Sequence, residues 1–130
     1  QPILSNSASG PVYSNLKLHG GFIGYAHYNS GWLTGTGTIP VADGEWHHLT
    51  WVNHNNGGMT EATMDLYVDG VFDKTIESGL SSNNRIDILG GSWSSKFAGD
   101  IACAQINNAK AFSATNVKDN FDAFRSRFSI

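Results

Sequence analysis

The sequence predicts an all-β protein, an antiparallel β-sandwich closed by a short amphipathic helix at its C-terminal end. Short apolar runs alternate with clusters of Gly, Ser, Asn and Asp, such as Asn53–Gly58 and Ser81–Asn84. Their spacing is close to the roughly 8–12 residues that separate strands in all-β folds. The apolar spacing becomes helical only near the end of the chain. The 130 residues are expected to form one domain.

The first expected strands are Leu16–Leu18 and Gly21–Tyr28. Trp32–Ile39 follows, although its alternating Thr and Gly residues are less typical of a strand. Trp46–Val52 is rich in aromatic and branched residues and is the clearest strand of this half.

A β-hairpin is expected in the middle of the chain. Thr63–Val68 alternates, with Met64, Leu66 and Val68 on one face and Asp65 and Tyr67 on the other. Asp69–Gly70 is a favoured hairpin turn because both residue types tolerate positive φ. The return strand is then Val71–Ile76, which places Asp65 opposite Lys74 and Tyr67 opposite Phe72. Strands Ile86–Leu89 and Ile101–Ile106 are expected after the hairpin.

The final segment has the pattern of an amphipathic helix. Its apolar residues recur at steps of four, three and four, at Val117, Phe121, Phe124 and Phe128. Ser113 is a suitable N-cap. Arg125 and Arg127 fall in the last turn, where the helix dipole favours cations. We expect this helix to cover one of the sheets.

Composition excludes several classes of protein. The eight Lys and Arg residues are scattered, so no basic patch for nucleic acid is expected. No apolar run approaches the roughly 18 residues of a membrane span. Cys103 is the single cysteine, which rules out an internal disulfide, and we expect it to be a small buried residue of a strand.

Several segments, in this order and spacing, resemble the laminin-G-like or concanavalin-A-like jelly-roll family. Gly44–Val52 (GEWHHLTWV) is similar to its strand with the Trp-His pattern, and Leu66–Gly70 (LYVDG) to its hairpin. Ile88–Gly91, Phe97–Ile101 and Ala111–Ser113 are similar to its later motifs. The resemblance implies a jelly-roll β-sandwich that binds glycans or proteins on extracellular, cell-surface or virion surfaces.

Two features depart from the family pattern. Many members have an acidic pair where this chain has Ala102 and Cys103. The opening residues, Gln1–Leu4, match a point well inside the family's fold, so we expect its first strand or strands to be missing here. An unpaired edge favours aggregation, and we therefore expect another segment or chain to cover it.

The C-terminal segment Asn120–Phe128 resembles the close of such domains in structural proteins of bacteriophages. This resemblance implies that the chain is a component of a virion.

Some relatives of this family are glycoside hydrolases, which use two facing carboxyl groups. Their Glu-x-Asp-x-x-Glu arrangement is absent from this sequence. The nearest candidate pairs are Glu61 with Asp65 and Asp65 with Asp69, but the turn explains Asp69 and the pairing with Lys74 explains Asp65. We therefore expect a protein that is not an enzyme.

No metal site is assigned from the sequence. His47 and His48 are adjacent on an expected strand and point to opposite faces, so they are predicted to have structural roles. Calcium remains a possibility that the family resemblance implies. Its oxygen ligands would come from residues such as Asp43, Asp87 and Asp100, which lie at expected strand ends or loops.

A carbohydrate site would combine aromatic platforms with polar side chains that meet hydroxyl groups. The candidates are Tyr25, His27, Tyr28, Asn29, Trp32, Asn53, Asn55 and Trp93. Trp32 and Trp93 are equally compatible with a platform and with packing. Trp46 and Trp51 are predicted to be packing residues, because large aromatics dominate core burial.

The sequence therefore favours a non-catalytic carbohydrate-binding and adhesion module of a larger cell-surface or virion protein. The alternative is a structural virion subunit, for capsid decoration or a fibre, that contacts other subunits. A glycoside hydrolase is the third and least favoured hypothesis, since the two-carboxylate requirement is unmet.

Overall fold

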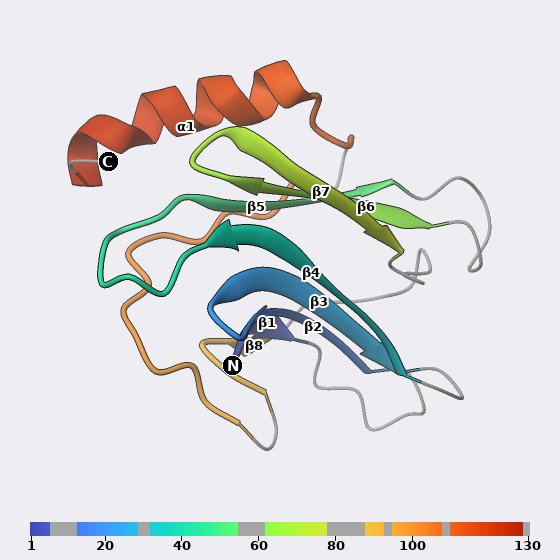
Figure 1. Ribbon diagram of the computed structural model, residues 1–130. Helices are drawn as coiled ribbons and strands as arrows, with labels where there is room; N and C mark the ends of the chain where they lie inside the picture. Colours follow the sequence, from blue (N-terminus) through green and yellow to red (C-terminus); the bar gives the residue numbers. More distant parts are fainter. Residues whose placement is uncertain are drawn as a thin grey trace.

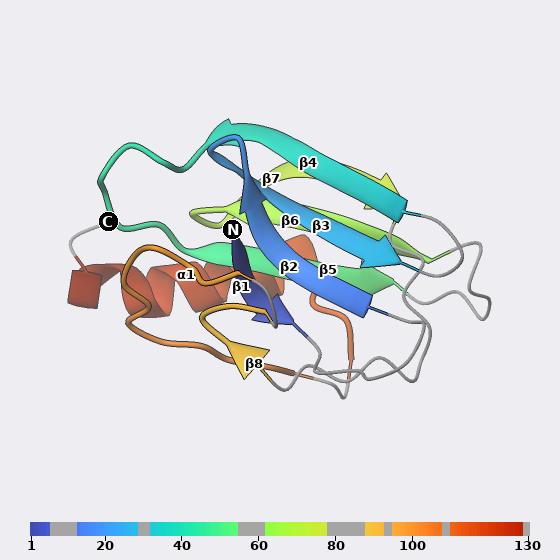
Figure 2. The same cartoon turned by 90° about the horizontal axis from the view of Figure 1, so that it is seen from below.

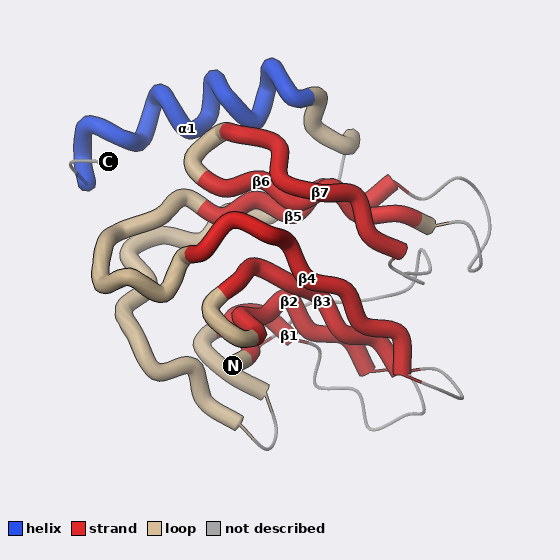
Figure 3. Tube along the Cα trace, in the orientation of Figure 1, coloured by secondary structure: helices blue, strands red, loops and turns tan. Residues whose placement is uncertain are grey.

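The computed structural model describes residues 1–5, 13–28, 32–54, 62–77, 88–92, 95–107 and 110–128. Within these ranges the chain forms two antiparallel sheets in stacked layers, with one helix on the outer side of the second sheet (Figure 1). Figure 3 shows the strands gathered in these two layers and the helix at the C-terminal end. The predicted sandwich with a terminal helix is confirmed.

The first layer, sheet A, has the strand order β4-β3-β2-β1-β8. These strands are β1 (Pro2–Ser5), β2 (Tyr13–His19), β3 (Phe22–Tyr28), β4 (Trp32–Pro40) and β8 (Ile88–Leu89). Gly20 and Gly21 join β2 to β3 with φ of 61° and 89°, the positive values that a two-residue hairpin turn requires. Strand β1 was not predicted from the sequence, and it lies between β2 and β8 (Figure 2).

The second layer, sheet B, contains β5 (Leu49–His54), β6 (Thr63–Val68) and β7 (Val71–Glu77) in that order. The predicted hairpin is confirmed, with Asp69 and Gly70 at φ of 52° and 76°. Tyr67 pairs with Phe72 as predicted.

The other predicted cross-strand pair is wrong, because Asp65 lies opposite Thr75 rather than Lys74. A bulge between these pairs leaves Asp73 without a partner on β6. The carboxylate of Asp73 instead reaches β4 in the other sheet. There it accepts hydrogen bonds from the Thr38 backbone N–H at 2.9 and 3.0 Å and from the Thr38 hydroxyl at 2.7 Å.

Glycines on β4 allow this close approach between the sheets. A Cβ on Gly35 would lie 2.8 Å from Ile76, and a Cβ on Gly37 would collide with the Asp73 carboxylate. The alternating Thr and Gly residues, which weakened the sequence-based prediction of this strand, therefore have a structural reason.

The core lies between the two sheets. Its buried residues come from the inward faces of both layers and include Ile23, Tyr25, Met64 and Leu66. Trp51 packs against this cluster, and its indole N–H donates to the Gly24 carbonyl at 3.0 Å. The predicted packing role of Trp51 is confirmed.

Two sequence-based predictions about strands are wrong. Strand β5 begins at Leu49 rather than at Trp46, so Trp46 lies in the preceding loop and is 43% exposed instead of packed in the core. The segment Ile101–Ile106 is not a strand, because it pairs with no other strand in the described part of the chain. Cys103 on that segment is consequently exposed rather than buried.

Helix α1 (Ala114–Phe128) begins at the predicted cap. The Ser113 hydroxyl accepts from the Asn116 backbone N–H at 3.2 Å, while the Asn116 side chain accepts from the Ser113 backbone N–H at 3.1 Å. Val117 is buried with Val52 and Tyr67 on the outer face of sheet B. No described helix is long and apolar enough to cross a membrane.

Candidate functional site

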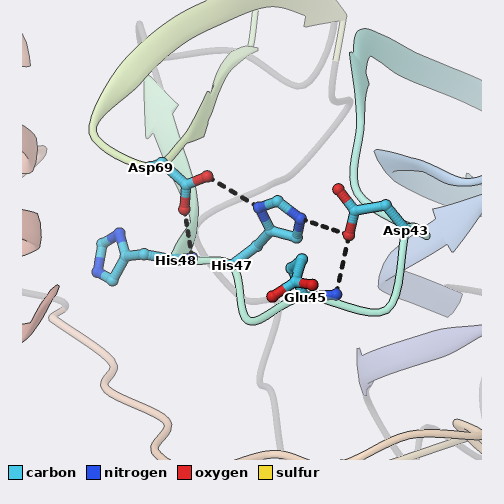
Figure 4. Close-up of polar contacts among 5 residues, drawn as sticks. All are labelled: Asp43, Glu45, His47, His48 and Asp69. Carbon is cyan, nitrogen blue, oxygen red and sulfur yellow. Dashed lines mark hydrogen bonds and ion pairs between the residues drawn. The ribbon is translucent and has the colours of Figure 1, made fainter. Parts of the chain in front are cut away.

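A cluster of polar side chains forms where the loop between β4 and β5 meets the β6–β7 turn (Figure 4). His47 lies between two carboxylates, with Nε2 3.0 Å from Asp43 Oδ1 and Nδ1 2.8 Å from Asp69 Oδ2. We call these three residues the His47 bridge. The second oxygen of Asp69 accepts from the His48 backbone N–H at 2.8 Å, and Asp43 accepts from the Glu45 backbone N–H at 3.0 Å.

The turns around the bridge explain its geometry. Asp69 occupies the left-handed region, which Asp tolerates well, and its backbone N–H donates to the His48 carbonyl at 2.8 Å. Gly44, with φ of 92°, reverses the chain so that Asp43 returns toward His47. The bridge therefore fastens the β4–β5 loop to the β6–β7 turn.

The bridge favours a protonated His47. Burial lowers the pKa of His47, but the hydrogen bonds and charges of Asp69 and Asp43 outweigh burial, and the net pKa is raised. The backbone N–H of Glu45 and the imidazole of His47 lower the pKa of Asp43. Both ring nitrogens of His47 face carboxylates, so the arrangement favours an imidazolium and leaves neither nitrogen without a partner to act as a general base.

His48, just before β5, points away from the His47 bridge and toward helix α1. Its Nε2 lies 3.3 Å from Asn120 Nδ2, and its Nδ1 lies 3.4 Å from the Thr50 hydroxyl oxygen. The ring also contacts that of Phe121 with the centroids 5.8 Å apart. Burial lowers the pKa of His48, with a smaller opposing effect of Asp69. The predicted structural roles of these two histidines agree with this geometry.

An exposed indole lies beside the bridge. Trp46 is 43% exposed, and its ring lies 6.0 Å from that of Phe128, near the end of α1. Asp43 and Glu45 in the same loop are exposed as well. These residues carry the two chemical groups that a saccharide contact needs, an aromatic face and hydrogen-bond acceptors. The sequence interpretation missed Trp46 because it placed this residue inside a strand.

The cluster borders a cleft of about 960 Å³ that opens between the two layers. Near helix α1, the cleft is lined by Glu45, Trp46, His47, His48, Phe124 and Phe128. Its volume is within the range of small-molecule sites.

The residues predicted from the sequence to bind carbohydrate do not gather at this cluster. Tyr25 and His27 lie in β3, and their side chains are only 0% and 5% exposed. The His27 Nδ1 is 2.9 Å from the Ser14 hydroxyl, to which the Tyr25 hydroxyl donates at 3.4 Å. Their burial is that of core residues rather than of a surface platform, although Tyr25 also lines the cleft that Trp46 borders.

For the remaining candidate residues, the role in carbohydrate binding stays a prediction. The backbones of Tyr28 and Trp32 pair across β3 and β4, but their side chains lie outside the described part of the structure. Asn53 belongs to β5 and is half-buried opposite Met64. Asn29, Asn55 and Trp93 lie outside the described residues.

Of the possible calcium ligands, Asp43 and Asp100 lie in the described part of the chain and are not gathered into a cation site there. Asp43 is held by His47, Asp100 is exposed, and Asp87 lies outside the described residues. Among the residues whose positions are described, no group of three or more His, Cys, Asp or Glu is arranged to hold a metal ion. Calcium needs about six to eight oxygen ligands.

Comparison with known proteins identifies the family. A laminin-G-type family model, described as the concanavalin A-like lectin/glucanases superfamily, matches residues 3–118. A solved S-layer domain-containing protein (residues 221–444) from Clostridium thermocellum ATCC 27405 aligns at 22% identity with a TM-score of 0.48. The alignment covers 93% of this chain and 62% of that one, so this chain spans less than two thirds of that structure. No curated protein matches the sequence. The family match covers most of the chain and agrees with the two-layer fold, and the chain belongs to the laminin-G-type concanavalin A-like lectin/glucanase superfamily.

Proposed function

We propose that this domain is a non-catalytic carbohydrate-binding and adhesion module of a larger protein exposed on a cell surface or a virion. Membership of a lectin-containing superfamily supports the class of ligand. The resemblance of Asn120–Phe128 to the end of bacteriophage structural proteins supports the virion as the setting.

The observation that carries the proposal is the exposed Trp46 ring at the border of the cleft. Apolar faces of sugar rings stack on indoles, and Asp43 and Glu45 offer acceptors for hydroxyl groups next to it.

A non-catalytic role is supported by three carboxylates that are engaged by side chains of the fold, those of Asp43, Asp69 and Asp65. Asp43 and Asp69 are held by His47, while Asp65 accepts from the Thr75 hydroxyl at 2.6 Å and faces His54 Nε2 at 2.9 Å. A glycosidase acid needs a raised pKa, whereas the pKa of Asp43 is lowered.

A glycan-array screen of the folded domain tests the proposal. We expect binding by the wild type and a loss of about fivefold or more in affinity for Trp46→Ala, since one stacked ring contributes on the order of 1 kcal/mol or more. Trp46→Tyr keeps an aromatic face and should retain most of the binding. Phe72→Ala removes another exposed aromatic, 50% exposed on β7, and is the matched control that should bind normally.

The screen is run with and without a calcium chelator, and circular dichroism verifies that each variant is folded. Binding that persists in Trp46→Ala would contradict this placement of the site. A folded wild type that binds no glycan would favour the structural alternative instead.

That alternative, a subunit that contacts other subunits, is supported by the exposed apolar side chains of Val71, Phe72, Leu89 and Ile106. Sedimentation analysis tests it. Concentration-dependent association that Phe72→Asp abolishes would favour this second function, and a monomer at all concentrations would argue against it.

A further inference from the structure

The cleft between the two layers follows one edge of β5. All six residues of this strand, Leu49–His54, line the cleft. Neighbouring side chains of a strand point to opposite faces, so a hollow that touches every residue lies along the edge of the strand rather than over one face. Among the described strands β5 pairs with β6 alone, so no described strand bonds to the backbone groups of this second edge.

The opposite wall of the cleft is also a stretch of backbone. Every residue of the segment Ile101–Ile106 lines the cleft, and Figure 2 shows this segment on the side of β5 that faces away from β6. Within the described chain, none of these six residues makes a backbone–backbone hydrogen bond. We call the space between β5 and Ile101–Ile106 the edge slot. Each of its walls presents donors and acceptors at the spacing of an extended chain.

The faces of the edge slot are apolar. Leu16 and Leu18 of sheet A line the cleft from the side of the core, and Phe112 and Phe124 line it beside helix α1. A strand that occupied the slot would therefore be covered on both faces, and apolar side chains would fill the space there.

The walls of the slot carry no acidic side chain, lysine or arginine. The residues of this kind that line the cleft are Glu45, which precedes β5, and Asp100 and Lys110, which flank the opposite wall in the chain. His54 at the end of β5 faces the carboxylate of Asp65 at 2.9 Å. An occupant without charge is therefore the one that these walls match, because a charged side chain would find no partner on them.

We propose that the edge slot binds an extended, uncharged and mainly apolar peptide strand of about six residues, supplied by another polypeptide. This strand would join sheet B between β5 and Ile101–Ile106 and pair with both walls. An extended peptide offers N–H and C=O groups along both of its edges at the spacing of the walls, which is the basis of recognition by strand addition. The inference does not rest on saccharide binding, since Trp46 lies in the loop before β5 and outside the slot.

Selection from a phage-displayed library of six-residue peptides rich in Val, Ile, Leu, Phe and Thr tests the proposal. We expect the folded domain to enrich such peptides. The selected peptide, made synthetically, should slow hydrogen–deuterium exchange of the Ile101–Ile106 amides about tenfold or more, because these amides gain hydrogen bonds. It should also slow the reaction of Cys103, which lines the slot, with Ellman's reagent. Phe72→Ala, which removes an exposed ring outside the cleft, is the control that should bind as the wild type does.

Backbone changes separate strand pairing from apolar contact alone. Peptides N-methylated at either set of alternate residues keep every side chain but lose the N–H groups of one edge, and each should bind about tenfold more weakly or worse. In the protein, Ala104→Pro and Gln105→Pro remove neighbouring N–H groups that point to opposite edges of the segment, so only one of the two should weaken binding.

Three results would overturn the proposal. The first is a folded domain that enriches no peptide, and the second is binding that survives both patterns of methylation. The third is protection of the Ile101–Ile106 amides in the domain without peptide, which would mean that the segment itself closes on β5.

Discussion

At the scale of single residues, Asp69 serves both the β6–β7 turn and the loop before β5. One carboxylate oxygen faces His47 Nδ1 at 2.8 Å, and the other accepts from the His48 backbone N–H at 2.8 Å. The residue also adopts φ of 52°, which Asn tolerates as well as Asp does. Asp69→Asn therefore removes the charge while it preserves the turn.

We expect Asp69→Asn to lower the free energy of unfolding by about 1–2 kcal/mol at pH 6, the value for a partly exposed hydrogen bond to a charged group. The loss should be smaller at pH 8. The pKa of His47 is raised, so its charged contacts stabilise the fold below about pH 6.5 and disappear as pH rises through the raised value. Urea unfolding at both pH values measures the difference. A loss that grows toward pH 8 would contradict the charged bridge.

At the scale of secondary-structure elements, the hairpin and the helix were predictable because their signals are local. Asp69–Gly70 specifies its own turn, and Ser113 with the spacing of Val117 and Phe121 specifies the helix. The bulge at Asp73 was not predictable, because its cause is a contact with Thr38 in the other sheet. Register shifts of this kind depend on tertiary neighbours that alternation within one strand does not reveal.

The segment Ile101–Ile106 also shows that the sequence pattern of one segment does not reveal its tertiary neighbours. Its composition suits a strand, but strand formation needs a partner edge, and the described chain offers none that pairs with it. Ile106 is accordingly 61% exposed.

For the candidate site, the structural role predicted for His47 agrees with its place between Asp43 and Asp69. Trp46 was missed because the start of β5 decides whether that ring is buried, and strand boundaries are the least certain part of a sequence-based prediction.

Because Cys103 is exposed, the reactivity of its thiol tests whether the segment Ile101–Ile106 is a buried strand. We expect Ellman's reagent to react with the thiol in the native domain at nearly the rate observed after unfolding in guanidinium, because solvent reaches the sulfur in both states. The absorbance of the released thiolate follows the reaction. Reaction only upon unfolding would mean that the segment is a buried strand, as its sequence pattern suggested.

At the scale of the whole molecule, the carboxylate of Asp73 links the two layers. It accepts hydrogen bonds from the backbone and hydroxyl of Thr38, at a place where Gly37 leaves room for it. The hydrogen bond from the Trp51 indole N–H to the Gly24 carbonyl also joins the sheets, whereas the core packing between them lacks direction. The link therefore helps to fix how one sheet lies on the other.

We expect Gly37→Ala to lower the free energy of unfolding by roughly 1–3 kcal/mol, because the new Cβ displaces a carboxylate that the Thr38 N–H and hydroxyl need. In an Asp73→Ala background the same substitution should cost much less, since the collision is gone. A double-mutant cycle by urea unfolding measures this coupling. Equal costs in the two backgrounds would show that Asp73 is not the obstacle.

The position of β1 has a consequence for the order in which the protein is made. Strand β1 pairs with β2 on one side and with β8 on the other, and the Ser5 hydroxyl donates to the Gly91 carbonyl at 2.9 Å. The hairpins β2–β3 and β6–β7 become complete soon after their residues leave the ribosome. The far edge of β1 must wait for β8, so this sheet edge stays exposed until Ile88 and Leu89 have been made. Nascent chains stalled before β8 should be the ones that most need a chaperone.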